Sequence, residues 1–201
     1  MEKEKPKVEQ PGSLQDILHR VIDFIPLSVQ TVSSDPQVKA RKLGNIAAMK
    51  AAAFSGALAM PPGPFGLLTL IPDLFGIWRI QAQLVADIAA VYGKTAFLTR
   101  EGMMYCLFRH GAAQALRDIV VRTGERLLIR QATLKTIEAV LQKIGVKLSQ
   151  RLATKAITRW LPVIGAVGVG AYAYYDTAEV AKTAIEAFAL ELKLDEERRA
   201  H

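Results

Sequence analysis

A long uncharged stretch decides between a membrane span and a helical globular fold. No charged residue occurs from Ala51 to Pro72, and a helix needs about 20 apolar residues to cross a bilayer. The middle of this stretch reads Pro61-Pro62-Gly63-Pro64, which breaks any helix. Because an unpaired backbone group facing lipid costs several kcal/mol, the sequence favours two helices separated by a break over a span.

Helical signals continue on both sides of this break. Asp35 is followed by Pro36, the order of a cap and a first helical residue, and an alanine-rich helix is expected over 38–60. A second helix is expected over 65–92, with Gly93 as its stop. Thr99 is expected to cap a third.

The fold class follows from these patterns. Three or four further helices are expected between Thr99 and Glu191, and no alternating β-branched segment bounded by turn dipeptides is evident. The sequence therefore predicts an all-α fold, a single-domain bundle of about six to eight helices with Pro/Gly-rich breaks. Residues 1–12 are expected to form a flexible tail, 13–195 the helical domain and 196–201 a C-terminal tail.

The cysteine count and the first residues indicate the compartment. Cys106 is the only cysteine of the 201 residues, which excludes an internal disulfide and a cysteine-rich zinc site. The opening MEKEKPKVEQPG alternates charges without an adjoining apolar core, so no secretory signal is evident. We therefore expect a cytoplasmic protein.

Positive charge is concentrated in one segment. The net charge is +7, and 109–159 contains eleven Lys or Arg against three acidic residues. Within it, five cations recur every fourth residue and would line one side of a basic amphipathic helix: Lys143, Lys147, Arg151, Lys155 and Arg159. Such a helix can contact an anionic membrane or an acidic partner, or be the solvated face of a core helix. The lack of interleaved aromatic residues argues against nucleic acid.

A family resemblance rests on two apolar elements. The first contains Pro61-Pro62-Gly63-Pro64-Phe65-Gly66, Ile71-Pro72-Asp73-Leu74 and, further on, Ala86-Asp87-Ile88-Ala89-Ala90-Val91-Tyr92-Gly93. The second is Leu161-Pro162-Val163-Ile164-Gly165-Ala166 with Asp176. Over roughly 40–190, this order resembles the EcsC family of bacterial proteins, named after an operon with an ABC transporter. The resemblance implies a helical cytoplasmic protein and supplies no catalytic residues.

Several polar residues are candidates for a site. The six residues concerned are Asp73, Arg79, Gln83, Asp87, Asp176 and Glu179. Asp176 and Glu179 share a helix face, as an acid/base or metal site would need, although the Glu-x-x-His pairs of di-metal bundles are missing. Cys106 and His110, four residues apart, can pair on a helix, but the thiol lies in an apolar run.

No phosphate-binding loop, nucleophile elbow or dinucleotide fingerprint occurs, so no cofactor or bound metal is expected. The leading hypothesis is a non-enzymatic cytoplasmic protein that associates peripherally with a membrane or a transporter-linked membrane complex through its basic helix. Two alternatives stay open: a carboxylate-based hydrolase or metal-dependent protein acting on a soluble ligand, and a self-associating structural protein whose partner is another copy.

Overall fold

The structure is a computed structural model that describes residues 24–58, 70–116, 120–123, 126–129 and 162–200. Its elements in chain order are α2 (Pro36–Leu58), α4 (Leu70–Val91), the 3-10 turn η1 (Thr95–Phe97), α5 (Arg100–Leu116), β1 (Val120–Thr123), β2 (Arg126–Ile129) and α7 (Pro162–Ala200). The all-α class is confirmed for this part of the chain. The predicted total of six to eight helices stays a prediction, since four α-helices lie within the described ranges.

One short hairpin corrects the expectation that the chain contains no strand. Strands β1 and β2 pair antiparallel, with Val120 opposite Ile129 and Thr123 opposite Arg126. Each strand has four residues, too few for an alternating pattern, and so short an apolar run cannot be told from a helix by periodicity. The hairpin leaves the fold class unchanged because helices make up the rest of the regular structure described.

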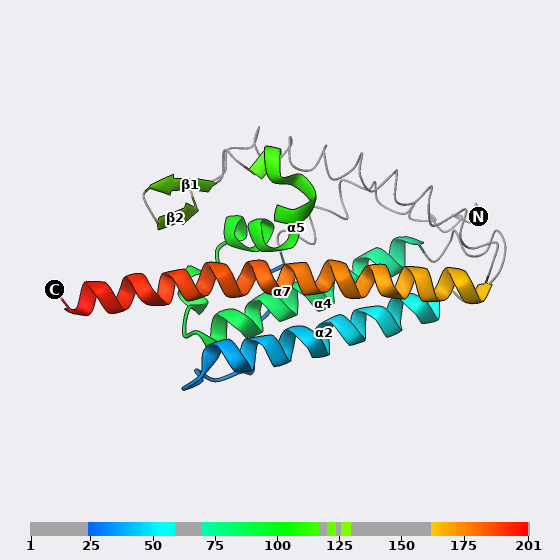
Figure 1. Ribbon diagram of the computed structural model, residues 1–201, viewed down its shortest axis with the longest axis horizontal. Helices are drawn as coiled ribbons and strands as arrows, with labels where there is room; N and C mark the ends of the chain where they lie inside the picture. The colour runs from blue at the N-terminus through cyan, green and yellow to red at the C-terminus, as the bar shows by residue number, and fades with distance from the viewer. Residues whose placement is uncertain (1–23, 59–69, 117–119, 124–125, 130–161, 201) are drawn as a thin grey trace, which may run out of the picture.

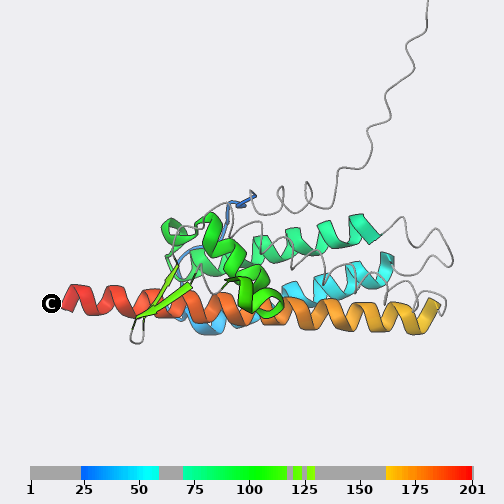
Figure 2. The ribbon, with the colours of Figure 1, turned by 90° about the horizontal axis from the view of Figure 1, so that it is seen from above.

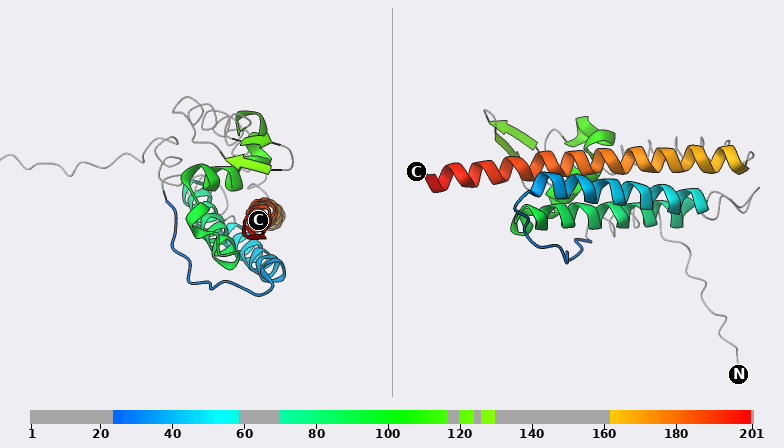
Figure 3. Two further views of the ribbon diagram at one scale, coloured as in Figure 1. Left: turned by 90° about the vertical axis from the view of Figure 1, so that its left-hand side faces the viewer. Right: turned by 60° about the horizontal axis from the view of Figure 1, so that its bottom comes forward.

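Three long helices form the body of the molecule. Helix α2 runs antiparallel to α4 and to α7, and each of the three contacts the other two (Figures 1 and 2). Helix α5 packs against α7 and α4, and β2 also contacts α7. The end-on view in Figure 3 shows the hairpin on the side of α7 away from α2. None of the helices among the described residues is long and apolar enough to cross a membrane.

The predicted helix boundaries are confirmed at three points. The backbone N–H of Val38 donates to Asp35 Oδ1 at 3.1 Å, which caps the start of α2. Helix α4 ends at Gly93, whose φ of 67° is the left-handed conformation that favours glycine. The backbone N–H of Gly102 donates to Thr99 Oγ1 at 3.2 Å, so Thr99 caps α5 as expected.

Helix α2 presents small side chains to its neighbours. Its buried residues recur every three or four positions: Ala40, Gly44, Ala47, Ala48, Ala51 and Ser55. A Cβ placed on Gly44 would lie 2.8 Å from the Cβ of Ala181 on α7, and one on Gly170 would lie 3.0 Å from the carbonyl oxygen of Ala52. The backbones of α2 and α7 therefore approach each other closely because neither side supplies a large side chain.

The central core is centred on α4 and α5. Trp78 of α4 meets Phe108 of α5 edge to face, with ring centroids 6.0 Å apart and planes at 86°. The side chains of Val85, Ile88 and Met103 are fully or almost fully buried. Helix α4 is buried over most of its surface, which explains why its sequence is so apolar.

Helix α7 is one continuous helix of 39 residues, where the sequence indicated shorter elements. The glycines at 165, 168 and 170 lie inside it and do not break it. Each glycine costs a helix about 1 kcal/mol relative to alanine, but at Gly170 a Cβ would lie 3.0 Å from the carbonyl oxygen of Ala52, a tight contact with the backbone of α2. The helix also includes residues 196–200, which the sequence assigned to a C-terminal tail.

Candidate functional site

An extended segment, residues 24–34, crosses the outer side of α4 and is called the strap below. Ser28 Oγ donates to Asp87 Oδ1 at 2.6 Å, and Gln83 Nε2 donates to the carbonyl oxygen of Leu27 at 3.1 Å. Gln83 Nε2 also donates to Asp87 Oδ1 at 3.0 Å. Gln83 and Asp87, two of the six candidates named from the sequence, thus form a hydrogen-bonded pair, and this pair holds the strap.

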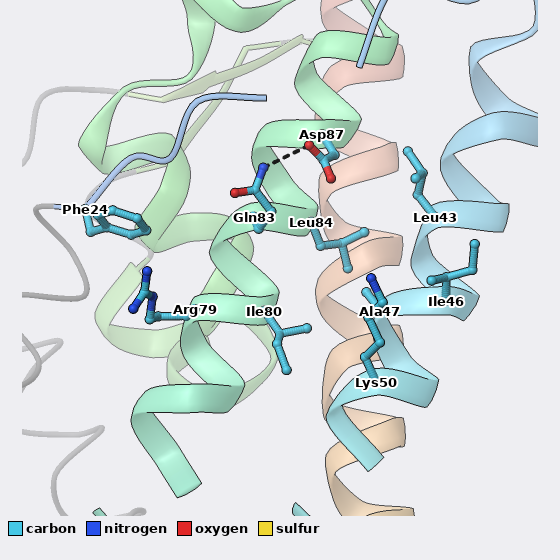
Figure 4. Close-up of a pocket in the computed structure, with 10 residues that line it drawn as sticks. All are labelled: Phe24, Leu43, Ile46, Ala47, Lys50, Arg79, Ile80, Gln83, Leu84 and Asp87. Carbon is cyan, nitrogen blue, oxygen red and sulfur yellow. Dashed lines mark hydrogen bonds between the residues drawn. The ribbon is translucent and has the colours of Figure 1, made fainter. Parts of the chain in front are cut away.

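A pocket of about 310 Å³ lies between α2 and α4, with Phe24 of the strap at its edge. In the close-up (Figure 4), Ile80 and Leu84 point from α4 toward α2, which contributes Leu43 and Ile46. The volume is at the lower end of the roughly 300–1,000 Å³ typical of ligand pockets. The walls are mostly apolar, so the few polar groups decide what the pocket can bind.

The polar groups of the pocket come from both helices. Lys50 reaches into it from α2, whereas Arg79 lies on the other side of α4 beside Phe24, and Gln83 and Asp87 lie further along α4 (Figure 4). The guanidinium of Arg79 lies 5.5 Å from the ring centroid of Phe24 and 5.9 Å from that of Phe75. Asp87 lies two helical turns beyond Arg79, about 12 Å along the axis, so its carboxylate does not pair with that guanidinium.

A second polar cluster is buried between α4, α5 and α7. Asp176 of α7 accepts from Gln81 Nε2 at 2.9 Å and from Tyr172 Oη at 3.2 Å. Its Oδ1 also lies 2.8 Å from His110 Nε2 of α5. Gln81 is 1% exposed and Asp176 9% exposed, so these hydrogen bonds replace water around a buried carboxylate. The cluster joins three helices at one point.

His110 completes this cluster with one ring nitrogen only. With Nε2 directed at Asp176, the buried Nδ1 has no hydrogen-bond partner. In the neutral tautomer whose Nε2 donates to the carboxylate, Nδ1 is an acceptor. Because Nδ1 is enclosed, the pair lacks the open position at which a His–Asp couple would take a proton from a substrate. The geometry therefore assigns the pair to holding the helices together.

Cys106 is not available as a nucleophile in this fold. It is 1% exposed, and burial raises the pKa of its thiol to about 12, partly opposed by the Arg109 guanidinium. The absence of a partner on His110 Nδ1 also means that the thiol one turn earlier makes no hydrogen bond to that atom. The reactive form of cysteine is the thiolate, which this surrounding disfavours.

The carboxylates singled out from the sequence do not gather in the described part of the chain. Asp87 is engaged at the outer side of α4, whereas Asp176 meets Gln81 inside the bundle. Asp73 lies in the first turn of α4 and its side chain is outside the described residues, and Glu179 is half-buried one turn beyond Asp176. No group of three or more His, Cys, Asp or Glu within the described ranges could hold a metal ion.

The basic residues predicted as an anionic-surface site fall outside the described residues. These are Lys143, Lys147, Arg151, Lys155 and Arg159. The structure instead shows a cationic surface that sequence reasoning missed, the outward face of α2. Four cations and no acid occur within α2, namely Lys39, Arg41, Lys42 and Lys50. Lys42 lies on the outward face and Arg41 at its edge, whereas Lys50 lines the pocket.

Large apolar side chains stand among these cations. Val38 is 62% exposed and Met49 65%. At 100° per residue, Val38, Lys42 and Met49 lie within about 40° of one another, opposite the buried alanine stripe. The outward face of α2 is therefore both basic and apolar. This pattern can be recognised in the sequence only once the residues buried on the opposite side of α2 are known.

Comparisons with protein families, with curated proteins and with solved structures gave no match to this chain.

Proposed function

We propose that this is a non-enzymatic cytoplasmic protein that associates peripherally with an anionic membrane surface, or with a transporter-linked membrane complex, as the resemblance to the EcsC family implies. The observation that carries the proposal is the outward face of α2, which exposes Lys42 beside Val38 and Met49, with Arg41 exposed at the edge of this face. A basic face with exposed apolar side chains is the arrangement that binds at lipid headgroups.

The size of this attraction fits a reversible contact. Each Lys or Arg near an anionic leaflet contributes around 1 kcal/mol, so the cations of α2 together supply a few kcal/mol, equivalent to a dissociation constant in the millimolar range. Stable attachment needs a second basic or apolar element. The basic residues of 143–159 provide that element in our proposal, and they make the contact sensitive to salt.

The test is sedimentation of the full chain with vesicles of phosphatidylcholine, with and without phosphatidylserine, at low and high salt. We expect binding only to the anionic vesicles and its loss at high salt. The double variant Arg41→Glu with Lys42→Glu removes roughly 2 kcal/mol of attraction before repulsion is counted, so binding should weaken at least about thirtyfold.

The matched control places the same charge change on α7. Lys182 and Lys193 are exposed there, and Lys182→Glu with Lys193→Glu should weaken binding much less. If both double variants lost the same affinity for anionic vesicles, net charge alone would explain the effect, and the proposed contact through α2 would be wrong. No binding of the unaltered chain to anionic vesicles would overturn the membrane contact itself.

Self-association is a second candidate, favoured by exposed apolar side chains near the start of α7. Val167 is 68% exposed, Tyr174 41% and Tyr175 61%. A second copy covering these residues would remove them from water, which is the usual reason for such a patch. Light scattering over a range of concentrations tests this, and a constant monomer mass would exclude it.

A further inference from the structure

We propose that the pocket between α2 and α4 binds a single-chain amphiphile with an anionic head, such as a medium-chain carboxylate or alkyl phosphate. This inference rests on the proposed function in one respect only: the membrane that the protein contacts would be the source of the ligand. It depends on the lining of the pocket, which combines an apolar wall with two cations, Lys50 and Arg79.

The apolar wall suits an alkyl chain. It is built from four aliphatic side chains on two antiparallel helices: Leu43, Ile46, Ile80 and Leu84. A volume of about 310 Å³ holds roughly ten groups of the size of a water or methylene, at about 30 Å³ each. This corresponds to a chain of about eight to ten carbons with its head.

The charges of the pocket select the sign of the head. Lys50 and Arg79 both line it, are both exposed and have no ion pair among the residues that the structure describes. The carboxylate of Asp87 already accepts hydrogen bonds from Ser28 and Gln83. An anionic head at Lys50 gains a charge-assisted hydrogen bond, whereas a cationic head meets repulsion there.

The first test is calorimetric titration of the full chain, without vesicles, with four compounds below their micellar concentrations. Decanoate and decyl phosphate carry the proposed chemistry, decylammonium has the same chain with the opposite charge, and butanoate has the head without the chain. We expect one decanoate or decyl phosphate per chain, and no measurable binding of decylammonium or butanoate. A preference between the two anions identifies a free carboxylate lipid or a phosphate head as the source.

Variants place the ligand in this pocket. Lys50→Gln should weaken binding at least about tenfold, the effect of one charge-assisted hydrogen bond, while Lys42→Gln on the same helix should not change it. Ile46→Trp fills the pocket from a position that is 42% exposed, so the fold tolerates it, and it should abolish binding. Met49→Trp, at a 65% exposed position outside the lining, is its control.

Three outcomes would overturn the inference: no binding of either anion, equal binding of decylammonium, or unchanged affinity in both Lys50→Gln and Ile46→Trp. The membrane proposal is tested separately, since these ligands are monomeric. The Arg41→Glu, Lys42→Glu variant should lose vesicle binding and keep decanoate binding, so failure of one proposal is distinguishable from failure of the other.

Discussion

The contact between Gly44 and Ala181 allows a quantitative test of how α2 and α7 pack. A Cβ on Gly44 would lie 2.8 Å from the Cβ of Ala181, whereas the optimal separation of two non-bonded carbon atoms is about 3.5–4.0 Å. Since both Cβ atoms are fixed to helical backbones, Gly44→Ala must move the helices about 1 Å apart. Overpacking of this kind costs about 1–3 kcal/mol, and the helix propensity of alanine returns about 1 kcal/mol.

A double-mutant cycle separates these two effects. Ala181→Gly alone should destabilise by about 2 kcal/mol, through lost helix propensity and one lost buried methyl. In the double variant Gly44→Ala with Ala181→Gly, the propensities cancel and the methyl moves across the interface. Its destabilisation should fall short of the sum of the single variants by at least about 1 kcal/mol.

Urea unfolding followed by circular dichroism measures the free energies of unfolding, provided that the slopes with urea stay equal. Gly168→Ala is the matched control, because a Cβ there meets nothing within 4 Å. It should stabilise the protein by up to about 1 kcal/mol. Additivity of the Gly44 and Ala181 variants within about 0.5 kcal/mol would refute the close contact between the two helices.

Two further predictions concern the core. Asp176→Ala leaves Gln81 and His110 without their buried acceptor and should cost about 3–5 kcal/mol in urea unfolding, whereas Glu179→Ala should cost about 0.5; a loss below 1 for Asp176→Ala would contradict the cluster. Burial raises the pKa of Cys106 from 9.0 to about 12, so at pH 8 iodoacetamide should alkylate the native chain at least about 1,000-fold more slowly than the unfolded chain. Because burial favours the neutral thiol, the contribution of Cys106 to the free energy of unfolding is complete below pH 9. Between pH 9 and about 12 the unfolded chain loses the thiol proton and the native chain keeps it, so the free energy of unfolding falls by about 1.4 kcal/mol per pH unit. Cys106→Ala should lessen this decline.

The parts of the fold that were predictable from sequence are those decided within one turn of the chain. Helices begin or end at Asp35, Gly93 and Thr99 through contacts with groups within a few residues, so the local sequence is enough to predict these boundaries. The continuity of α7 could not be predicted in this way. Three glycines lie within this helix, and the tight contact of Gly170 with the backbone of α2 is a tertiary feature that the local sequence does not show.

The polar contacts depend on tertiary structure and were only partly predictable. Gln83 and Asp87 are four residues apart, and their hydrogen bond follows from helical spacing alone. Gln81 and Asp176 are far apart in sequence, and no local pattern shows which of the polar residues on α4 faces inward. Asp176 was among the candidates named from the sequence, but His110 was considered only beside Cys106, its neighbour on the same helix.

The pairing of α2 with α7 also determines when the chain can fold during synthesis. These two helices form the most extensive contact of the described part of the bundle, yet more than a hundred residues separate their nearest ends. Translation at about 5–20 residues per second leaves α2 without this partner for several seconds. Meanwhile its alanine stripe is open to water and to other chains, so slow translation or loss of α7 would leave a nascent chain dependent on chaperones.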